Sequence, residues 1–270
     1  MKVSLVQICS TRDIDANLAR CERFAHIAAA DGADWILYPE NAPFLGKDAE
    51  KAAVAETSDG PIVERFRTIA REAHAWVTLG SFPEASPNEG KTYNTQLLID
   101  PSGNTAATYR KIHLFDVDVE GNRSYRESDS VVGGDEVVLT SVSAPGGDEH
   151  RVGLSVCYDL RFPELYRELV ARGATVLTVP SAFTLQTGRD HWHPLLRARA
   201  IENQSYVLAP NQWGHHFGRR SSYGHSAIYD PWGQRIACAP DKEGVVTAEL
   251  DFEYLEDVRR RMPSLRHRRL

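Results

Sequence analysis

Cys157 is the residue whose surroundings in this sequence most favour nucleophilic chemistry. It ends the apolar run 152–156, and a polar stretch separates it from Pro163. Proline suits the first turn of a helix, so we expect the cysteine at a strand-to-helix turn. Backbone N–H groups and the helix dipole favour a thiolate there and can hold a developing oxyanion. The alternative is an inert buried thiol, which is the commoner kind of cysteine.

Glu40 and Lys111 are candidate partners of this cysteine. Glu40 follows Pro39 at the carboxyl end of an expected strand, where ligand crevices of open α/β sheets lie. A glutamate there can act as a general base. Lys111 follows another expected strand and could offer positive charge to an anionic intermediate. Either residue could instead be an ordinary surface charge, because the spacing of the three carries no signal of its own.

The elements that must position these residues alternate between strands and helices. Helices are expected at residues 17–30, 62–74, 162–171 and 191–204, from apolar periodicity and flanking glycine or proline. Strands are expected at residues 3–9, 35–38, 76–81, 94–99, 105–109, 151–157, 175–179, 206–210, 226–229, 235–239 and 245–250. Segment 112–135 is the least regular and is expected to be a long functional loop. The pattern predicts a layered α/β fold.

The second half of the chain repeats the plan of the first. Segments 32–39 and 173–180 each close a helix with glycine, start a strand and stop at proline. Because both copies fall in the same order of elements, a structural pseudo-repeat of two halves is the better interpretation. No linker rich in Gly, Ser or Pro divides the chain, so we expect one domain over 1–270, with a C-terminal arm at about 252–270.

Composition and charge exclude several classes of protein. The net charge of −6 does not suit a general nucleic-acid binder. The arginine-rich run at residues 259–269 is interpreted as a solvated or partner-docked arm. The sequence has no apolar stretch of the roughly 18 residues that a membrane helix needs. Of the four widely spaced cysteines, Cys9, Cys21 and Cys238 are interpreted as core residues.

The cysteine and histidine spacing gives no reason to expect a metal. The chain has no CxxC pair, and free thiols fit a reducing cytoplasm. His191 and His193 would point to different faces of a helix, and a third ligand at zinc-like spacing is lacking. We therefore expect neither a metal nor a disulfide framework.

The chain resembles the nitrilase superfamily of carbon–nitrogen hydrolases over nearly its whole length. Three segments carry most of the resemblance: Tyr38-Pro39-Glu40, Tyr109-Arg110-Lys111-Ile112-His113-Leu114-Phe115-Asp116 and Val156-Cys157-Tyr158-Asp159-Leu160-Arg161-Phe162-Pro163-Glu164-Leu165. The resemblance implies a four-layer αββα sandwich and a Glu-Lys-Cys triad that needs no metal or organic cofactor. It makes Cys157 the nucleophile, Glu40 the base and Lys111 the stabiliser of the oxyanion.

Within the superfamily, the chain is similar to the branch that contains ω-amidases and deaminated glutathione amidases. The stretch 219–226 and nearby Gly214-His215-His216 favour the second of these. This likeness implies an amidase for small carboxylate-bearing amides. It also implies substrate-binding roles for Glu127, Tyr158, Arg161, Phe183 and Thr187, with the Tyr158 N–H as an oxyanion donor.

Several alternatives remain open at this stage. Arg161 could pair with Asp159 or Glu164 instead of a substrate carboxylate. The same triad would serve an N-carbamoyl-amine amidohydrolase or a nitrilase, and a non-catalytic binding protein on the same fold is the alternative from another class. The resemblance also implies a homodimer in which the C-terminal segment reaches the partner.

Overall fold

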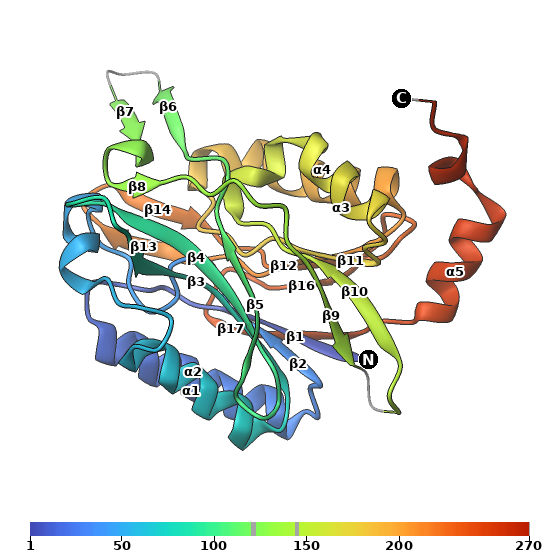
Figure 1. Ribbon diagram of the computed structural model, residues 1–270, viewed down its shortest axis with the longest axis horizontal. Coiled ribbons are helices and arrows are strands. Elements are labelled where there is room, and N and C mark those ends of the chain that lie inside the picture. Colours follow the sequence, from blue (N-terminus) through green and yellow to red (C-terminus); the bar gives the residue numbers. More distant parts are fainter. Residues whose placement is uncertain (120–122, 144–145, 270) are drawn as a thin grey trace.

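Two stacked β-sheets form the centre of the molecule (Figure 1), which is a computed structural model that describes residues 1–119, 123–143 and 146–269. The first sheet has the order β17-β1-β2-β3-β4-β5, and β8 pairs with β4. Its strands are β1 (Lys2–Gln7), β2 (Trp35–Leu37), β3 (Trp76–Ala85), β4 (Thr92–Ile99), β5 (Thr105–Arg110), β8 (Val131–Val132) and β17 (Gly244–Glu249). The second sheet has the order β16-β15-β12-β11-β10-β9. Its strands are β9 (Leu139–Ser143), β10 (Glu149–Gly153), β11 (Val176–Thr178), β12 (Tyr206–Ala209), β15 (Ala227–Tyr229) and β16 (Arg235–Cys238).

The two sheets repeat one pairing pattern. In the first sheet β1, β2 and β3 are parallel, and the flanking pairs β17–β1, β3–β4 and β4–β5 are antiparallel. In the second sheet β10, β11 and β12 are parallel, with antiparallel flanking pairs β9–β10, β12–β15 and β15–β16. The corresponding strands occur in the same chain order, apart from β17, which returns from the C-terminal part. The predicted pseudo-repeat is therefore confirmed.

Helices cover the outer face of each sheet and complete an αββα sandwich, as predicted (Figure 1). Helices α1 (Ile14–Ala30) and α2 (Pro61–Ala73) pack on the first sheet through one apolar core that includes Phe24, Phe66 and Val77. Helices α3 (Pro163–Ala171) and α4 (Leu185–Asn203) cover the second sheet. A second apolar core contains residues of both sheets, such as Leu5 and Leu177, and so joins them.

The structure corrects three parts of the sequence-based assignment. Segment 112–135 contains the hairpin β6 (Asp116–Val119) and β7 (Arg123–Arg126), the short helix η2 (Glu127–Asp129) and β8; its residues 120–122 lie outside the described part. The hairpin β13 (Trp213–Phe217) and β14 (Arg220–Tyr223) was not predicted, nor was β9. Helix α4 starts at Leu185, six positions before the predicted start, and contains Pro194. Gly188, a weak helix former, concealed its first turns.

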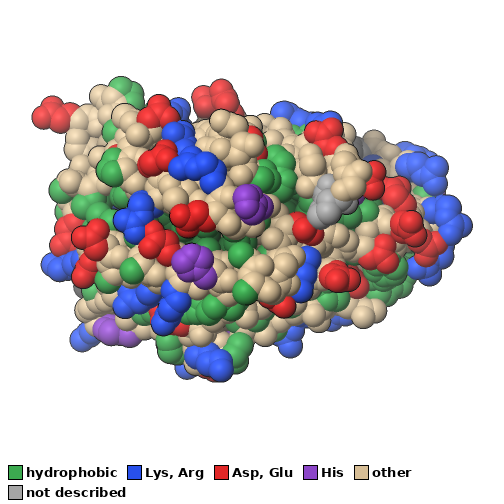
Figure 2. Space-filling model, turned by 90° about the horizontal axis from the view of Figure 1, so that it is seen from below, with side chains coloured by type: hydrophobic (Ala, Val, Ile, Leu, Met, Phe, Trp, Pro, Cys, Tyr) green, Lys and Arg blue, Asp and Glu red, His purple; other side chains and the backbone are tan. Residues whose placement is uncertain are grey.

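Four further helices are present in the described part of the chain. They are η1 (Asp48–Val54), η3 (Cys157–Arg161), α5 (Phe252–Arg261) and η4 (Ser264–His267). Across the described residues, no helix is both long and apolar enough to cross a membrane. On the face seen from the side of α1 and α2, acidic and basic side chains are interspersed (Figure 2).

Candidate active site

Cys157 lies at the sharp turn that follows β10. Its backbone has a φ of 51°, a left-handed conformation that is uncommon for a residue other than glycine. The Cys157 N–H donates a hydrogen bond to the Pro180 carbonyl at 2.9 Å, which fixes the turn against the end of β11. The short helix η3 begins at Cys157, and α3 begins at Pro163. The predicted strand-to-helix turn is present, with η3 inserted before the main helix.

The resting state of this thiol differs from the expectation of a stabilised thiolate. The side chain of Cys157 is buried, and burial raises the pKa of the thiol above its ordinary value. The Glu40 carboxylate raises this pKa further, whereas the Lys111 ammonium lowers it. Burial and the Glu40 carboxylate outweigh the Lys111 ammonium and the Ala182 N–H in their effect on this pKa, so the free protein holds a thiol beside a base.

Glu40 is buried behind this thiol and held by three donors. Its Oε1 accepts hydrogen bonds from Asn94 Nδ2 at 2.9 Å and from Lys111 Nζ at 3.0 Å. Its Oε2 accepts one from the Ala182 N–H at 2.8 Å. A carboxylate fixed in this way needs no reorganisation before it takes a proton from a neighbouring thiol.

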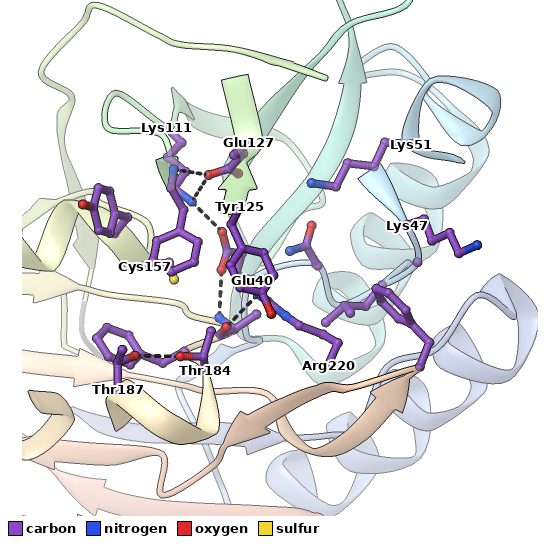
Figure 3. Close-up of a pocket in the computed structure, with 18 of the residues that line it drawn as sticks. Glu40, Lys47, Lys51, Lys111, Tyr125, Glu127, Cys157, Thr184, Thr187 and Arg220 are labelled. Atoms are coloured by element: carbon purple, nitrogen blue, oxygen red, sulfur yellow. Dashed lines mark hydrogen bonds and ion pairs between the residues drawn. The ribbon is translucent and has the colours of Figure 1, made fainter. Parts of the chain in front are cut away.

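Lys111 lies between two carboxylates (Figure 3). Its Nζ is 3.0 Å from Glu40 Oε1 and 2.8 Å from Glu127 Oε2, and its side chain is only 2% exposed. Burial alone would lower the pKa of the ammonium, but Glu127 and Glu40 raise it well above the ordinary value. Lys111 therefore carries a fixed positive charge beside Cys157 at neutral pH.

Glu127 supplies the second half of this charge balance. Burial would raise the pKa of its carboxyl, but Lys111, Lys51 and the Phe115 N–H lower it to about 2. The Phe115 N–H donates to Oε2 at 2.7 Å, and Asn94 Nδ2 donates to Oε1 at 3.1 Å. Asn94 thus joins the Glu127 and Glu40 carboxylates, a role that no pattern in the sequence indicated.

The depressed pKa of Glu127 predicts a specific loss of stability in acid. The pKa is 4.5 in the unfolded reference and about 2 in the folded protein, so the unfolded chain binds the proton more readily. The contribution of Glu127 is complete above the unfolded pKa and is lost as the pH falls through the folded value. The free energy of unfolding, measured with urea at about pH 6 and at about pH 3, should fall more between these values for wild type than for Glu127→Gln. Equal losses in the two proteins would contradict this assignment.

A buried carboxylate outside the cavity connects the segments that carry Lys111 and Cys157. Asp159 is fully buried and accepts hydrogen bonds from the Tyr109 hydroxyl at 2.7 Å and from the Val156 N–H at 2.7 Å. The His113 backbone N–H donates to Asp159 Oδ1 at 3.0 Å, and the ring Nδ1 of His113 lies 2.7 Å from the same oxygen. This carboxylate therefore fixes the two segments relative to each other.

A cavity of about 410 Å³ opens onto the Cys157 thiol. The structure brings Glu40, Lys111 and Cys157 together in its wall, although they come from distant parts of the chain. The five residues named above as substrate contacts line the same cavity: Glu127, Tyr158, Arg161, Phe183 and Thr187. The wall as a whole combines a nucleophile, a base and a fixed cation with aromatic surface, which suits the attack of a thiol on a small acyl compound.

Comparison with known proteins identifies the family to which this chain belongs. The model of the carbon–nitrogen hydrolase family matches residues 2–260. The chain belongs to the carbon–nitrogen hydrolase family. A deaminated glutathione amidase of Synechocystis is 44% identical over 265 residues, which cover 97% of this chain and 96% of the relative. The predictions of a nitrilase-like family and of a hydrolytic enzyme are confirmed.

Two solved structures show the same fold as this carbon–nitrogen hydrolase. The NitFhit protein of Caenorhabditis elegans superposes with a TM-score of 0.90 and 38% identity, covering 99% of this chain and 65% of that one. This hydrolase therefore spans about two thirds of the NitFhit chain. NitFhit is named as a nitrilase and fragile histidine triad fusion protein. Nit3 of Saccharomyces cerevisiae, a member of branch 10 of the nitrilase superfamily, gives a TM-score of 0.86 and 30% identity, covering 97% and 94%.

Arg161 of the hydrolase faces the cavity and not the carboxylates suggested as internal partners. Its guanidinium lies 3.2 Å from His191 Nδ1 and 5.4 Å from the centre of the Phe183 ring. Asp159 is bonded to the residues described above, and the described residues include no ion pair between Arg161 and Glu164. The guanidinium thus forms part of the cavity wall.

The other expected contacts of the hydrolase differ in how free they are to bind substrate. The Thr187 hydroxyl lies 2.7 Å from that of Thr184, so it shares its hydrogen bonds with a neighbour. Phe183 packs against Trp192, with ring centres 5.1 Å apart, and offers an apolar wall. The Tyr158 ring meets Phe115 edge to face, with ring centres 5.1 Å apart.

Sequence reasoning missed most of the positive charge in the cavity of this hydrolase. Lys47 and Lys51 come from the segment around η1, and Arg219 and Arg220 come from the β13–β14 hairpin. Figure 3 shows Arg220 and Lys51 directed toward the cavity, whereas the ammonium of Lys47 points away from Glu40. The Arg219-Arg220 pair was visible in the sequence, but only the unpredicted hairpin places it here.

Proposed function

We propose that this carbon–nitrogen hydrolase is an amidase for small amides that carry carboxylates, with deaminated glutathione as its first candidate substrate. The observation that carries the proposal is one cavity in which a thiol, a base and a fixed ammonium meet arginines of η3 and of the β13–β14 hairpin. The likeness to the Synechocystis relative, a deaminated glutathione amidase, supports the choice of substrate. Such a reaction converts an amide and water into an acid and an amine.

The proposed reaction begins with proton transfer from Cys157 to Glu40. The thiolate attacks the amide carbonyl, and the resulting oxyanion is stabilised by the Lys111 ammonium and the Tyr158 N–H. The tetrahedral intermediate breaks its carbon–nitrogen bond, and Glu40 returns the proton to the leaving amine. Water, activated by Glu40, then hydrolyses the thioester and releases the acid and the thiol. Proton transfer to Glu40 is needed because the resting thiol is not ionised.

Glu127 takes no proton in this scheme. Its pKa of about 2 keeps it ionised, so it holds Lys111 in place and charged. The ammonium therefore has a permanent counter-charge, and Glu40 is free to become neutral during the first step. The two carboxylates beside Lys111 thus have different proposed roles that follow from their surroundings.

Substitution of Arg161 should weaken binding of carboxylate-bearing amides. For Arg161→Gln we expect KM to rise roughly ten- to a hundredfold, since a hydrogen bond to a charged group contributes about 1.5–3 kcal/mol. Steady-state kinetics with a carboxylate-bearing amide and with a neutral amide of similar size would measure this. The matched control is Arg189→Gln on α4, an exposed arginine outside the cavity. An equal rise in KM for the charged and the neutral amide would contradict a contact between Arg161 and the substrate carboxylate.

A panel of substrates distinguishes the proposed activity from its alternatives. Deaminated glutathione should release cysteinylglycine, and a 2-oxo acid ω-amide should release ammonia. A preference for N-carbamoyl amines or nitriles would instead indicate the alternative chemistries of this superfamily. If no compound in the panel is hydrolysed faster by wild type than by Cys157→Ala, the protein is a binding protein on this fold.

We also propose that residues 1–270 act as one catalytic domain in a cytoplasmic homodimer, with the C-terminal arm at the partner. Helix α5 is held on its own chain by the buried Leu255 and Val258, and Arg259 donates to the Ala174 carbonyl at 2.9 Å. The next arginines, Arg260 and Arg261, are exposed and pair with Asp257 of the same helix, so a second copy could reach them at the surface. A solution mass of one chain would contradict the dimer.

A further inference from the structure

Three potential metal ligands meet on the surface of this protein away from the catalytic cavity. They are His193 of α4, His225 after β14 and Cys238 at the end of β16. One ligand atom from each residue lies within 4.8 Å of the others. Each side chain is partly exposed, so an ion in solution could reach the cluster.

The hydrogen bonds of His193 fix the tautomer that a metal needs. Its Nε2 lies 3.3 Å from a guanidinium nitrogen of Arg235, which can only donate, so Nε2 must carry a lone pair. Its Nδ1 therefore carries the proton and donates to the Tyr229 hydroxyl at 2.9 Å. A ligating histidine that donates its other N–H to a fixed acceptor is a common arrangement in metal sites.

The other two ligands are also held near His193. The Trp192 indole N–H donates to the His225 carbonyl at 2.9 Å, which joins the His225 segment to α4. The Asp241 carboxylate lies 3.2 Å from His225 Nε2 and is exposed, so it can turn toward the cluster. Cys238 is half-buried and not the core residue expected from its strand context.

We propose that His193, His225 and Cys238 bind a divalent cation of the zinc type, with the Asp241 carboxylate as the fourth ligand. Imidazole and thiolate ligands suit zinc, which prefers four ligands in a tetrahedron. Ligand atoms around zinc lie roughly 3.5 Å apart, so small rotations of these partly exposed side chains would close the site. The guanidinium of Arg235 contacts His193 Nε2 in the structure and must leave this nitrogen when the metal binds.

Cobalt titration of a Cys157→Ser protein tests this site without interference from the catalytic thiol. We expect one Co²⁺ to bind per chain with a thiolate-to-cobalt charge-transfer band, and Zn²⁺ to displace it. The band should disappear in Cys157→Ser/Cys238→Ser and persist in Cys157→Ser/Cys9→Ser. Cys9 is the matched control because it is also half-buried, and not the core residue expected from the sequence, and its Sγ lies 3.6 Å from His216 Nδ1.

Two further variants in the same background test the neighbours of the ligands. Tyr229→Phe removes the acceptor of the His193 N–H, together with a hydrogen bond to Arg235, and should weaken Co²⁺ binding by about ten- to a hundredfold. Arg235→Gln removes the competing cation and should tighten binding. No charge-transfer band, or a band that survives Cys238→Ser, would overturn the proposal. If the band disappeared in Cys157→Ser/Cys9→Ser but not in Cys157→Ser/Cys238→Ser, the metal would lie elsewhere, and the proposal would be overturned as well.

Discussion

Replacement of Cys157 with alanine should reduce turnover of every amide substrate by about 10⁴-fold or more, the scale seen when a catalytic nucleophile is removed. The cavity keeps its base and its ammonium in this variant, but no atom remains to form the thioester. A steady-state assay of amine or ammonia release measures the loss. Binding of the carboxylate-bearing product should change little, because the arginines of the cavity are untouched.

Cys9→Ala is the matched control for this experiment. Cys9 is a half-exposed thiol that does not line the catalytic cavity, so its loss should leave turnover near the wild-type value. A Cys157→Ala protein that remains folded and retains more than about a hundredth of wild-type activity would contradict a nucleophilic role.

Substitution Glu40→Gln should lower kcat by roughly 10²–10⁴-fold, the usual contribution of a general base. The amide preserves the size of the side chain, but it cannot take the Cys157 proton or activate water. The carboxylate also raises the pKa of the thiol, so its removal should lower that pKa. The residual activity of the variant should therefore rise with pH as more thiolate forms, and a pH–rate profile would show this.

Glu84→Gln provides a control of similar burial. Glu84 is bonded to Arg110 at 2.7 Å and lies outside the catalytic cavity, so its loss should affect stability more than kcat. If both glutamine variants reduced kcat equally, the effect of Glu40→Gln would be structural. A wild-type pH–rate profile in Glu40→Gln would also contradict its role as the base.

Local patterns were sufficient for the parts of the fold that have strong apolar periodicity. Helix α2 was predicted within one residue, because its apolar face is regular and Pro61 marks its start. The β13–β14 hairpin escaped prediction because its residues are mostly polar, and histidines and glycine interrupt any alternation. The β6–β7 hairpin was interpreted as part of a loop because each strand has only four residues and most of these residues are polar.

The sequence indicated the chemistry of the site better than its electrostatics. Residue types and strand ends suggested Glu40, Lys111 and Cys157, and the family resemblance joined them. The resting protonation of Cys157 could not be predicted, because it depends on burial and on the nearness of Glu40. The bridging role of Asn94 also depends on distances between strands and helices that lie far apart in the chain.

Rapid-quench mass spectrometry of the peptide that contains Cys157 tests the central claim most directly. Wild-type protein quenched in acid during turnover should carry the acyl half of the substrate on Cys157, and the adduct should disappear when the substrate is exhausted. An acyl group found on a different residue would contradict the account. So would full-rate hydrolysis by a protein whose Cys157 is shown to be blocked by an alkyl group.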